Sequence, residues 1–291
     1  MNIKNICKKI KPVYYSLMGM RLFIKKLIVT IKYIFLKENK KTEKKLIILG
    51  TGSSLNQDIA KIKEQVNDCD VMCVNSYLLN ENFEIIKPNI YVLADPSYFA
   101  KNVVGLGLND RNIFIENIKK KLQWNLVLYL PKRAKSCYLV EELSRNEYIT
   151  IKYITDNELK PFFFNKYKAY NKNDVLPPFY NVLVMCLSIG LYKKYKAIDF
   201  YGADHNWCHD LHVGEDNLVY IVEHHCYKEK SSSGMHPSQY EDGRPITMGD
   251  MMSGFGKLFN EYYNIQEWAN YNGTEIYNKS SVSFIDAFKR K

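Results

Sequence analysis

The stretch that decides the fold is LIILGTGSSL, residues 46–55. Its four apolar residues, Leu46–Leu49, have the composition of a buried strand, and the glycine turn that follows them precedes a predicted helix start. Glycine lets the backbone approach an anion closely, serine can cap a helix, and a helix N-terminus attracts negative charge. The sequence therefore predicts a phosphate site, or else an ordinary strand-to-helix turn, at Gly50, Thr51, Gly52, Ser53 and Ser54.

The turn differs from the two common nucleotide-binding signatures. Leu55 stands where the dinucleotide fingerprint requires its third glycine, and no Gly-Lys-Ser/Thr follows as in a P-loop. If the turn holds phosphate, we expect a ligand with a single nucleoside.

Short apolar runs alternate with helical stretches along the rest of the chain. Strands are expected at 46–49, 70–75, 89–94, 126–130, 149–154, 197–201 and 275–277. Helices are expected at 56–67, 110–122, 137–146, 180–194 and 250–271. This alternation predicts an α/β, Rossmann-like fold with a mostly parallel sheet covered on both faces.

Small or acidic polar residues follow four of these strands. Besides the glycine turn they are Asn75, Asp95, and the group Gly202, Asp204 and His205. Each residue alone is consistent with a turn or a helix cap. Ligands bind at the carboxyl ends of parallel strands. The presence of such residues after four strands therefore predicts that they line one crevice.

Charge separates the N-terminal arm from the body. The chain of 291 residues carries a net charge of +10, but residues 1–45 hold 13 Lys/Arg against 2 Asp/Glu, and the remainder holds 28 against 29. A nucleic-acid-binding body would carry a basic face of its own. We therefore expect no nucleic acid among the partners.

The arm, residues 1–44, mixes apolar and basic residues without an uncharged run long enough to span a bilayer or a cleavable signal. We expect residues 1–40 to form a basic amphipathic segment that binds an anionic membrane surface. The protein would then be cytoplasmic and peripheral on the inner face of the cell membrane. The alternative is that the arm packs on the body or on a second protomer in a homo-oligomer.

The cysteines and histidines are the candidate metal ligands in the sequence. The seven cysteines lack CxxC spacing and indicate reduced thiols in a cytosolic protein. Cys208 lies near three histidines, but a second tight pair of ligands is missing, so neither a metal nor a cofactor is expected.

Two inserted segments are expected in the catalytic domain, residues 45–291. Residues 155–178 are aromatic and predict a lid or acceptor platform, or else satellite core. Residues 206–247 are polar and predict a second lid, with a hairpin near Leu218–His224. His205 and His236 are the candidate general bases, with Asp204 orienting or binding.

Residues 45–205 are similar to the bacterial family 42 sialyltransferases, and more loosely to MptE-like pyrophosphokinases. The similarity lies in the 46–55 stretch, the strand ending at Asn75, the Asp95–Phe99 segment, and the run from Tyr180 to Asp204. It implies a GT-A-type Rossmann-like fold and donor-binding roles for Gly50, Thr51, Gly52, Ser53 and Asn75. It also places Tyr180 and Asn181 at a helix start against the donor.

The sequence departs from that family at three places. Asp95 stands where the family tends to have asparagine, Asn206 and Trp207 follow the Gly-x-Asp segment in place of a tyrosine, and His236 lies upstream of the last long helix start. The resemblance implies inverting, metal-independent transfer of an acidic sugar, such as a sialic acid, a related nonulosonic acid or Kdo, from a CMP-linked donor to a cell-surface glycan or glycolipid. The alternatives are a Mg²⁺-dependent pyrophosphokinase and a non-catalytic, membrane-bound assembly protein.

Overall fold

The computed structural model describes residues 16, 18–28, 30–31, 37–100, 106–155, 166–172, 176–209, 211–221, 226, 239 and 243–290. Its strands are β1 (Thr42–Leu49), β2 (Cys69–Val74), β3 (Ile90–Val92), β4 (Leu126–Pro131), β5 (Ile149–Ile154), β6 (Tyr195–Tyr201), β7 (His212–Val213), β8 (Val219–Tyr220), β9 (Glu275–Asn278) and β10 (Lys289–Arg290). Its α-helices are α2 (Leu55–Lys63), α3 (Phe83–Ile86), α4 (Leu106–Lys121), α5 (Tyr138–Leu143), α6 (Lys166–Tyr170), α7 (Val182–Tyr192) and α8 (Met248–Asn272).

Eight strands form one sheet in the order β10-β9-β6-β1-β2-β3-β4-β5, and every pairing in it is parallel. The predicted α/β, Rossmann-like class is confirmed, and all seven expected strands are present. The sequence did not indicate β10, because two exposed basic residues, Lys289 and Arg290, carry no strand pattern.

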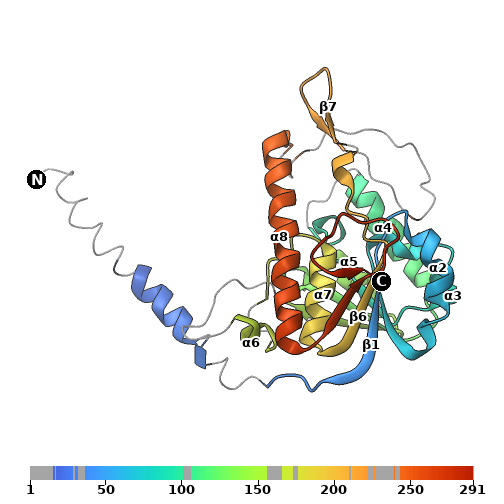
Figure 1. The fold of residues 1–291 in the computed structure, drawn as a ribbon, viewed down its shortest axis with the longest axis horizontal. Coiled ribbons are helices and arrows are strands. Elements are labelled where there is room, and N and C mark those ends of the chain that lie inside the picture. Colours follow the sequence, from blue (N-terminus) through green and yellow to red (C-terminus); the bar gives the residue numbers. More distant parts are fainter. Residues whose placement is uncertain are drawn as a thin grey trace, which may run out of the picture.

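Helices cover both faces of the sheet (Figure 1). Alternate residues of β1 face opposite ways: Leu46 and Ile48 belong to the core beneath α7 and α8, whereas Ile47 and Leu49 belong to the core beneath α2, α3, α4 and α5. All four side chains are fully buried. Burial of each contributes about 1.5–3 kcal/mol, so β1 stabilises both cores.

The order of the strands changes direction at β1. The next strand in sequence, β2, lies on one side of β1, and β6 lies on the other. In open parallel sheets such a switch point leaves a crevice at the carboxyl ends of the strands. The turns after β1 and β6 therefore meet where a ligand site is expected.

Helical residues of the arm lie outside the sheet-and-helix body in Figure 1. Their large apolar side chains are exposed, among them Phe23, Ile24 and Ile28. Among the described residues, no helix combines the length and apolarity needed to cross a membrane.

The hairpin expected near Leu218–His224 is formed by β7 and β8, which pair through His212 and Tyr220. Its turn lies earlier than predicted, because Asn217 takes the left-handed conformation with φ 57° between the two strands. Residues 222–225 lie outside the described residues.

Candidate nucleotide site

A cavity of about 470 Å³ lies at the carboxyl ends of the sheet strands. It falls within the size range of small-molecule sites. Its walls include ten of the predicted site residues: Gly50, Thr51, Gly52, Asn75, Asp95, Tyr180, Asn181, Gly202, Asp204 and His205. Segments far apart in sequence thus meet in one crevice, as the strand-end pattern predicted.

The turn after β1 is hydrogen-bonded directly to the turn after β6. Gly50 N donates to Tyr201 O and Gly52 N donates to Gly202 O, each at 2.8 Å. A Cβ atom on Gly50 would lie 2.3 Å from Gly202 O, and one on Gly52 would lie 2.5 Å from Asp204 Oδ1. Both positions require glycine because the two turns are in van der Waals contact, which makes the floor of the cavity rigid.

Asp204 occupies the place at the start of α2 where the sequence predicts a phosphate. Its buried carboxylate accepts hydrogen bonds from Ser54 N at 3.0 Å, from Ser53 Oγ at 3.3 Å and from Ser54 Oγ. The N-terminus of α2 therefore already holds an internal anion, so the phosphate predicted there lacks a free site at Ser54 N. Ser53 and Ser54 do not line the cavity, whereas Asp204 does, and both of its carboxylate oxygens already accept hydrogen bonds from the turn.

His205 follows Asp204 in the left-handed conformation, with φ 51°. Its Nε2 lies 2.7 Å from the Tyr262 hydroxyl and 2.9 Å from Asn181 Nδ2, and its ring lies against Trp207. Burial lowers the pKa of His205 to about 3, which keeps the imidazole neutral at pH 7. This environment argues against the general-base role predicted for His205, because Nε2 already has two partners and the ring is a weak base.

Asn75 and Asp95 mark the ends of β2 and β3. Asn75 is held in the left-handed conformation at φ 45° by the Tyr91 hydroxyl, which donates to Asn75 O at 2.6 Å. Its Oδ1 is buried and has no hydrogen-bond partner among the described residues. Asp95 is exposed and accepts from Ser97 N at 2.8 Å, capping a short 3₁₀ helix, Pro96–Tyr98. Both side chains can meet a polar ligand.

Aromatic side chains form one wall of the cavity. Phe179, Tyr180 and Trp207 line it, and Trp207 stacks on Phe255 of α8 with ring centroids 5.6 Å apart. In the sequence, Trp207 stands out only as a departure from the family pattern. Such a wall suits stacking of a nucleobase or a sugar face.

Arg133 is the charged cavity-lining residue that sequence reasoning missed. It lies in a 3₁₀ turn, Lys132–Ala134, directly after β4, and its guanidinium lies 5.4 Å from the centre of the Phe99 ring. It is the one Lys or Arg among the described residues that line the cavity. The strand-end rule applied to β4 would have indicated it.

A serine loop, residues 280–283, holds the turn after β6 from behind. Ala203 N donates to Ser280 Oγ at 3.0 Å, and Ser283 Oγ donates to Ala203 O at 2.7 Å. Phe284 N adds a bond of 2.9 Å to Asp204 O. Hydrogen bonds at Ala203 N, Ala203 O and Asp204 O therefore hold the backbone directly before His205 in place.

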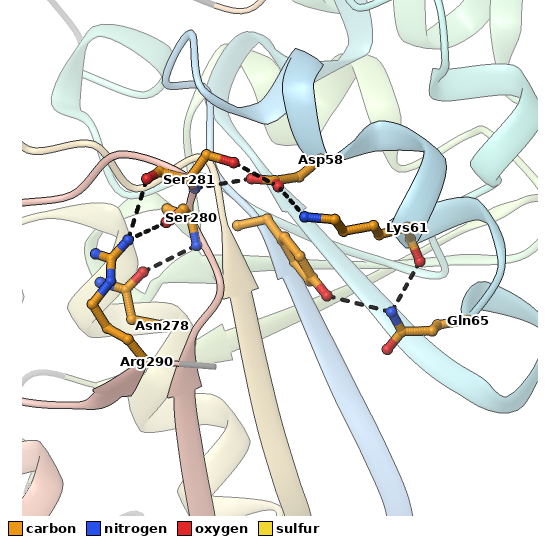
Figure 2. Close-up of polar contacts among 8 residues, drawn as sticks. Asp58, Lys61, Gln65, Asn278, Ser280, Ser281 and Arg290 are labelled. Carbon is orange, nitrogen blue, oxygen red and sulfur yellow. Dashed lines mark hydrogen bonds and ion pairs between the residues drawn. The ribbon is translucent and has the colours of Figure 1, made fainter.

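Figure 2 shows how the serine loop is itself anchored. The buried Asp58 of α2 accepts from Ser281 N at 3.0 Å and from Ser281 Oγ at 2.7 Å. Arg290 donates to Ser280 O at 2.6 Å and to Ser281 O at 3.3 Å. The serine loop is thus hydrogen-bonded to α2, to β10 and to the turn that forms the cavity floor. These bonds preorganise the site.

Several predicted features lie elsewhere. His236 and residues 156–165 of the first expected lid are outside the described residues. Of the described part of that lid, Tyr167 and Tyr170 pack on α8, and Tyr170 is buried in the core. His209 packs against Phe284 and His212 against Tyr220, away from the cavity.

No group of three or more His, Cys, Asp or Glu residues that could hold a metal ion occurs in the described part of the chain. Cys208 is a free, exposed thiol. The acidic residues that line the cavity are Asp95 and Asp204, and Asp204 is occupied by the glycine turn.

No protein-family model matches the chain, and no curated protein matches it. Among solved structures the chain is similar to the MAf glycosyltransferase from Magnetospirillum magneticum AMB-1, at 10% identity and a TM-score of 0.47. The match covers 88% of this chain and 35% of that protein, so this chain spans about a third of its length. A likeness of this degree assigns neither a reaction nor a substrate to the chain.

Proposed function

We propose that the protein is a glycosyltransferase whose cavity binds a nucleotide sugar. The observation that carries this proposal is the convergence of the glycine turn, Asn75, Asn181 and His205 on one cavity at the strand switch point. The sequence resemblance implies donor-binding roles for the first three. The cavity adds an aromatic wall and one guanidinium, which suit a nucleoside and its phosphate.

The donor that we propose is a CMP-linked acidic sugar, and the acceptor is a hydroxyl of a cell-surface glycan or glycolipid. A base removes the acceptor proton, the acceptor oxygen attacks the anomeric carbon, and the bond to the phosphate breaks, which inverts that centre and releases CMP. His236 remains the proposed base. Arg133 is proposed to stabilise the negative charge that the departing phosphate gains, without a metal.

Pyrophosphoryl transfer is the weaker alternative. It requires Mg²⁺ held by carboxylates, and the hydrogen bonds from Ser53 and Ser54 leave Asp95 as the carboxylate in the cavity with free ligand capacity. A non-catalytic assembly role predicts that no nucleotide binds at all.

Replacing Arg133 by methionine is expected to weaken CMP binding about tenfold to a hundredfold, because a charge-assisted hydrogen bond to phosphate is lost. The measurement is isothermal titration with CMP, CDP, UDP and ATP on the full chain. Lys132→Met is the matched control, since Lys132 is the exposed neighbour that does not line the cavity.

The control variant should bind CMP as the native protein does. Equal affinities for both variants and the native protein would remove Arg133 from the site. An ATP-selective response would favour the kinase, and absence of any nucleotide response would end the glycosyltransferase proposal.

We further propose that the arm attaches the protein to the inner face of the cell membrane. Deleting residues 1–36 is expected to abolish cosedimentation with vesicles that contain anionic lipid, because basic and apolar side chains are removed together. The deletion stops there because Glu38 pairs with Lys194 at 2.6 Å and Asn39 donates to Tyr192 O, so both belong to the body.

Vesicles of neutral lipid serve as the control and should bind neither form. Full-length protein that stays in the supernatant with anionic vesicles would contradict the membrane role. A change of the deleted form to a smaller oligomer would assign the arm to protein contact instead.

A further inference from the structure

Three side chains on three segments form a hydrogen-bonded cluster beside the cavity: Asn181 before α7, Tyr262 on α8 and His205 after β6. Asn181 Oδ1 accepts from Val184 N at 2.9 Å, as the N-cap of α7. This bond fixes the orientation of the amide, so Nδ2 must be the atom that faces the other two side chains. Asn181 Nδ2 therefore donates to the Tyr262 hydroxyl at 2.8 Å and to His205 Nε2 at 2.9 Å.

The position of the Tyr262 proton follows from that orientation. Tyr262 is fully buried, and burial raises the pKa of its hydroxyl, so the hydroxyl stays protonated. Its oxygen accepts from Asn181, so its proton is directed to His205 Nε2, 2.7 Å away. Nε2 then faces two donors, which share its single lone pair, so it must be the unprotonated nitrogen of the ring.

The neutral ring carries its proton on the other nitrogen, Nδ1. That nitrogen has no hydrogen-bond partner among the described residues, and His205 lines the cavity. We propose that His205 is a ligand-binding residue, held by Tyr262 and Asn181 as the Nδ1–H tautomer, whose Nδ1–H donates to an anionic oxygen of the bound nucleotide sugar. This rests on the proposed function, and it assigns to His205 the role of a donor in place of a base.

Such a ligand has two anionic groups, the phosphate and the sugar carboxylate, and we assign the contact to the phosphate. CMP carries the phosphate alone and cytidine carries neither, so these two probes separate the phosphate contact from the rest of the nucleoside. A contact to the phosphate changes the affinity for CMP and leaves the affinity for cytidine unchanged.

Substitutions at position 205 distinguish the two ring nitrogens. The amide nitrogen of asparagine occupies the place of Nδ1, and asparagine tolerates the positive φ of 51° at this residue. The amide of glutamine extends to the place of Nε2 instead. His205→Asn is therefore expected to bind CMP within about threefold of the native protein, and His205→Gln about tenfold more weakly, with cytidine unaffected in both.

The tautomer is measured independently of any ligand by ¹⁵N NMR of histidine-labelled protein, with His205 assigned by its absence in His205→Asn. We expect the Nδ1–H pattern. Tyr262→Phe removes the donor to Nε2 and should shift the His205 signals, whereas Tyr263→Phe, which removes an exposed hydroxyl bonded to Asp286, should not.

Three outcomes overturn the assignment: an Nε2–H pattern, weak CMP binding by His205→Asn, or unchanged CMP binding by His205→Gln. Loss of sugar transfer in His205→Asn with native CMP affinity would restore the base role. If the native protein binds no nucleotide, both this inference and the proposed function fail, whereas native binding with weak binding by His205→Asn overturns the inference alone.

Discussion

Alanine at position 50 is expected to prevent the chain from reaching its native fold, with a loss of stability above about 4 kcal/mol. Its Cβ would lie 2.3 Å from Gly202 O and 2.9 Å from Gly202 C. Both atoms are backbone, and the bonds between the two turns hold them in place. The clash can be relieved only by separating β1 from β6, which breaks the centre of the sheet.

Gly254→Ala is the matched control for Gly50→Ala. A Cβ atom on Gly254 meets nothing within 4 Å, and the residue lies within α8. Alanine favours a helix over glycine, so this variant should gain about 1 kcal/mol. The measurement is urea unfolding followed by far-ultraviolet circular dichroism. A Gly50→Ala protein within about 1 kcal/mol of the native protein would contradict the contact between the turns.

Asp204→Ala is expected to lower the free energy of unfolding by about 3 kcal/mol. The change removes a buried carboxylate that accepts from Ser54 N, Ser53 Oγ and Ser54 Oγ. It leaves buried donors at the start of α2 without a partner and removes a favourable charge at the helix N-terminus.

Asp216→Ala tests whether this cost comes from burial. Asp216 also accepts from a backbone N–H, that of Leu218, and from a hydroxyl, that of Tyr220, but it is exposed on the β7–β8 hairpin. Its loss should cost much less stability than the loss of Asp204, because solvent screens an exposed carboxylate. Equal losses for the two variants in the same unfolding experiment would show that Asp204 does not hold the glycine turn.

The strands and the polar residues at their ends could be predicted, because they depend on the local pattern of apolar and polar residues. The apolar run Leu46–Leu49 and the strand ends at Asn75 and Asp95 follow from spacing in the sequence, and they lie at one edge of the sheet as expected. Arg133 follows from the same rule but was overlooked, because the polar turn after β4 begins with Lys132 and lacks the small or acidic residues of the other strand ends.

Side-chain roles that depend on distant partners could not be predicted in this way. Whether the start of α2 binds an external phosphate depends on Asp204, which lies 150 residues from Ser54. The tautomer that we propose for His205 depends on Tyr262, 57 residues further along the chain. Local spacing contains no information on where such carboxylates and hydroxyls point.

The pairing of β1 with β6 has a kinetic consequence. Thr42 pairs with Tyr195, so the two central strands of the sheet meet only after more than 150 intervening residues have been brought together. Such long-range parallel pairing closes a large loop and is slow. Since the cavity floor consists of the turns behind these two strands, we expect the site to form late in folding. If a nucleotide binds there, we expect it to stabilise the folded protein and to leave the early, partly folded chain unaffected.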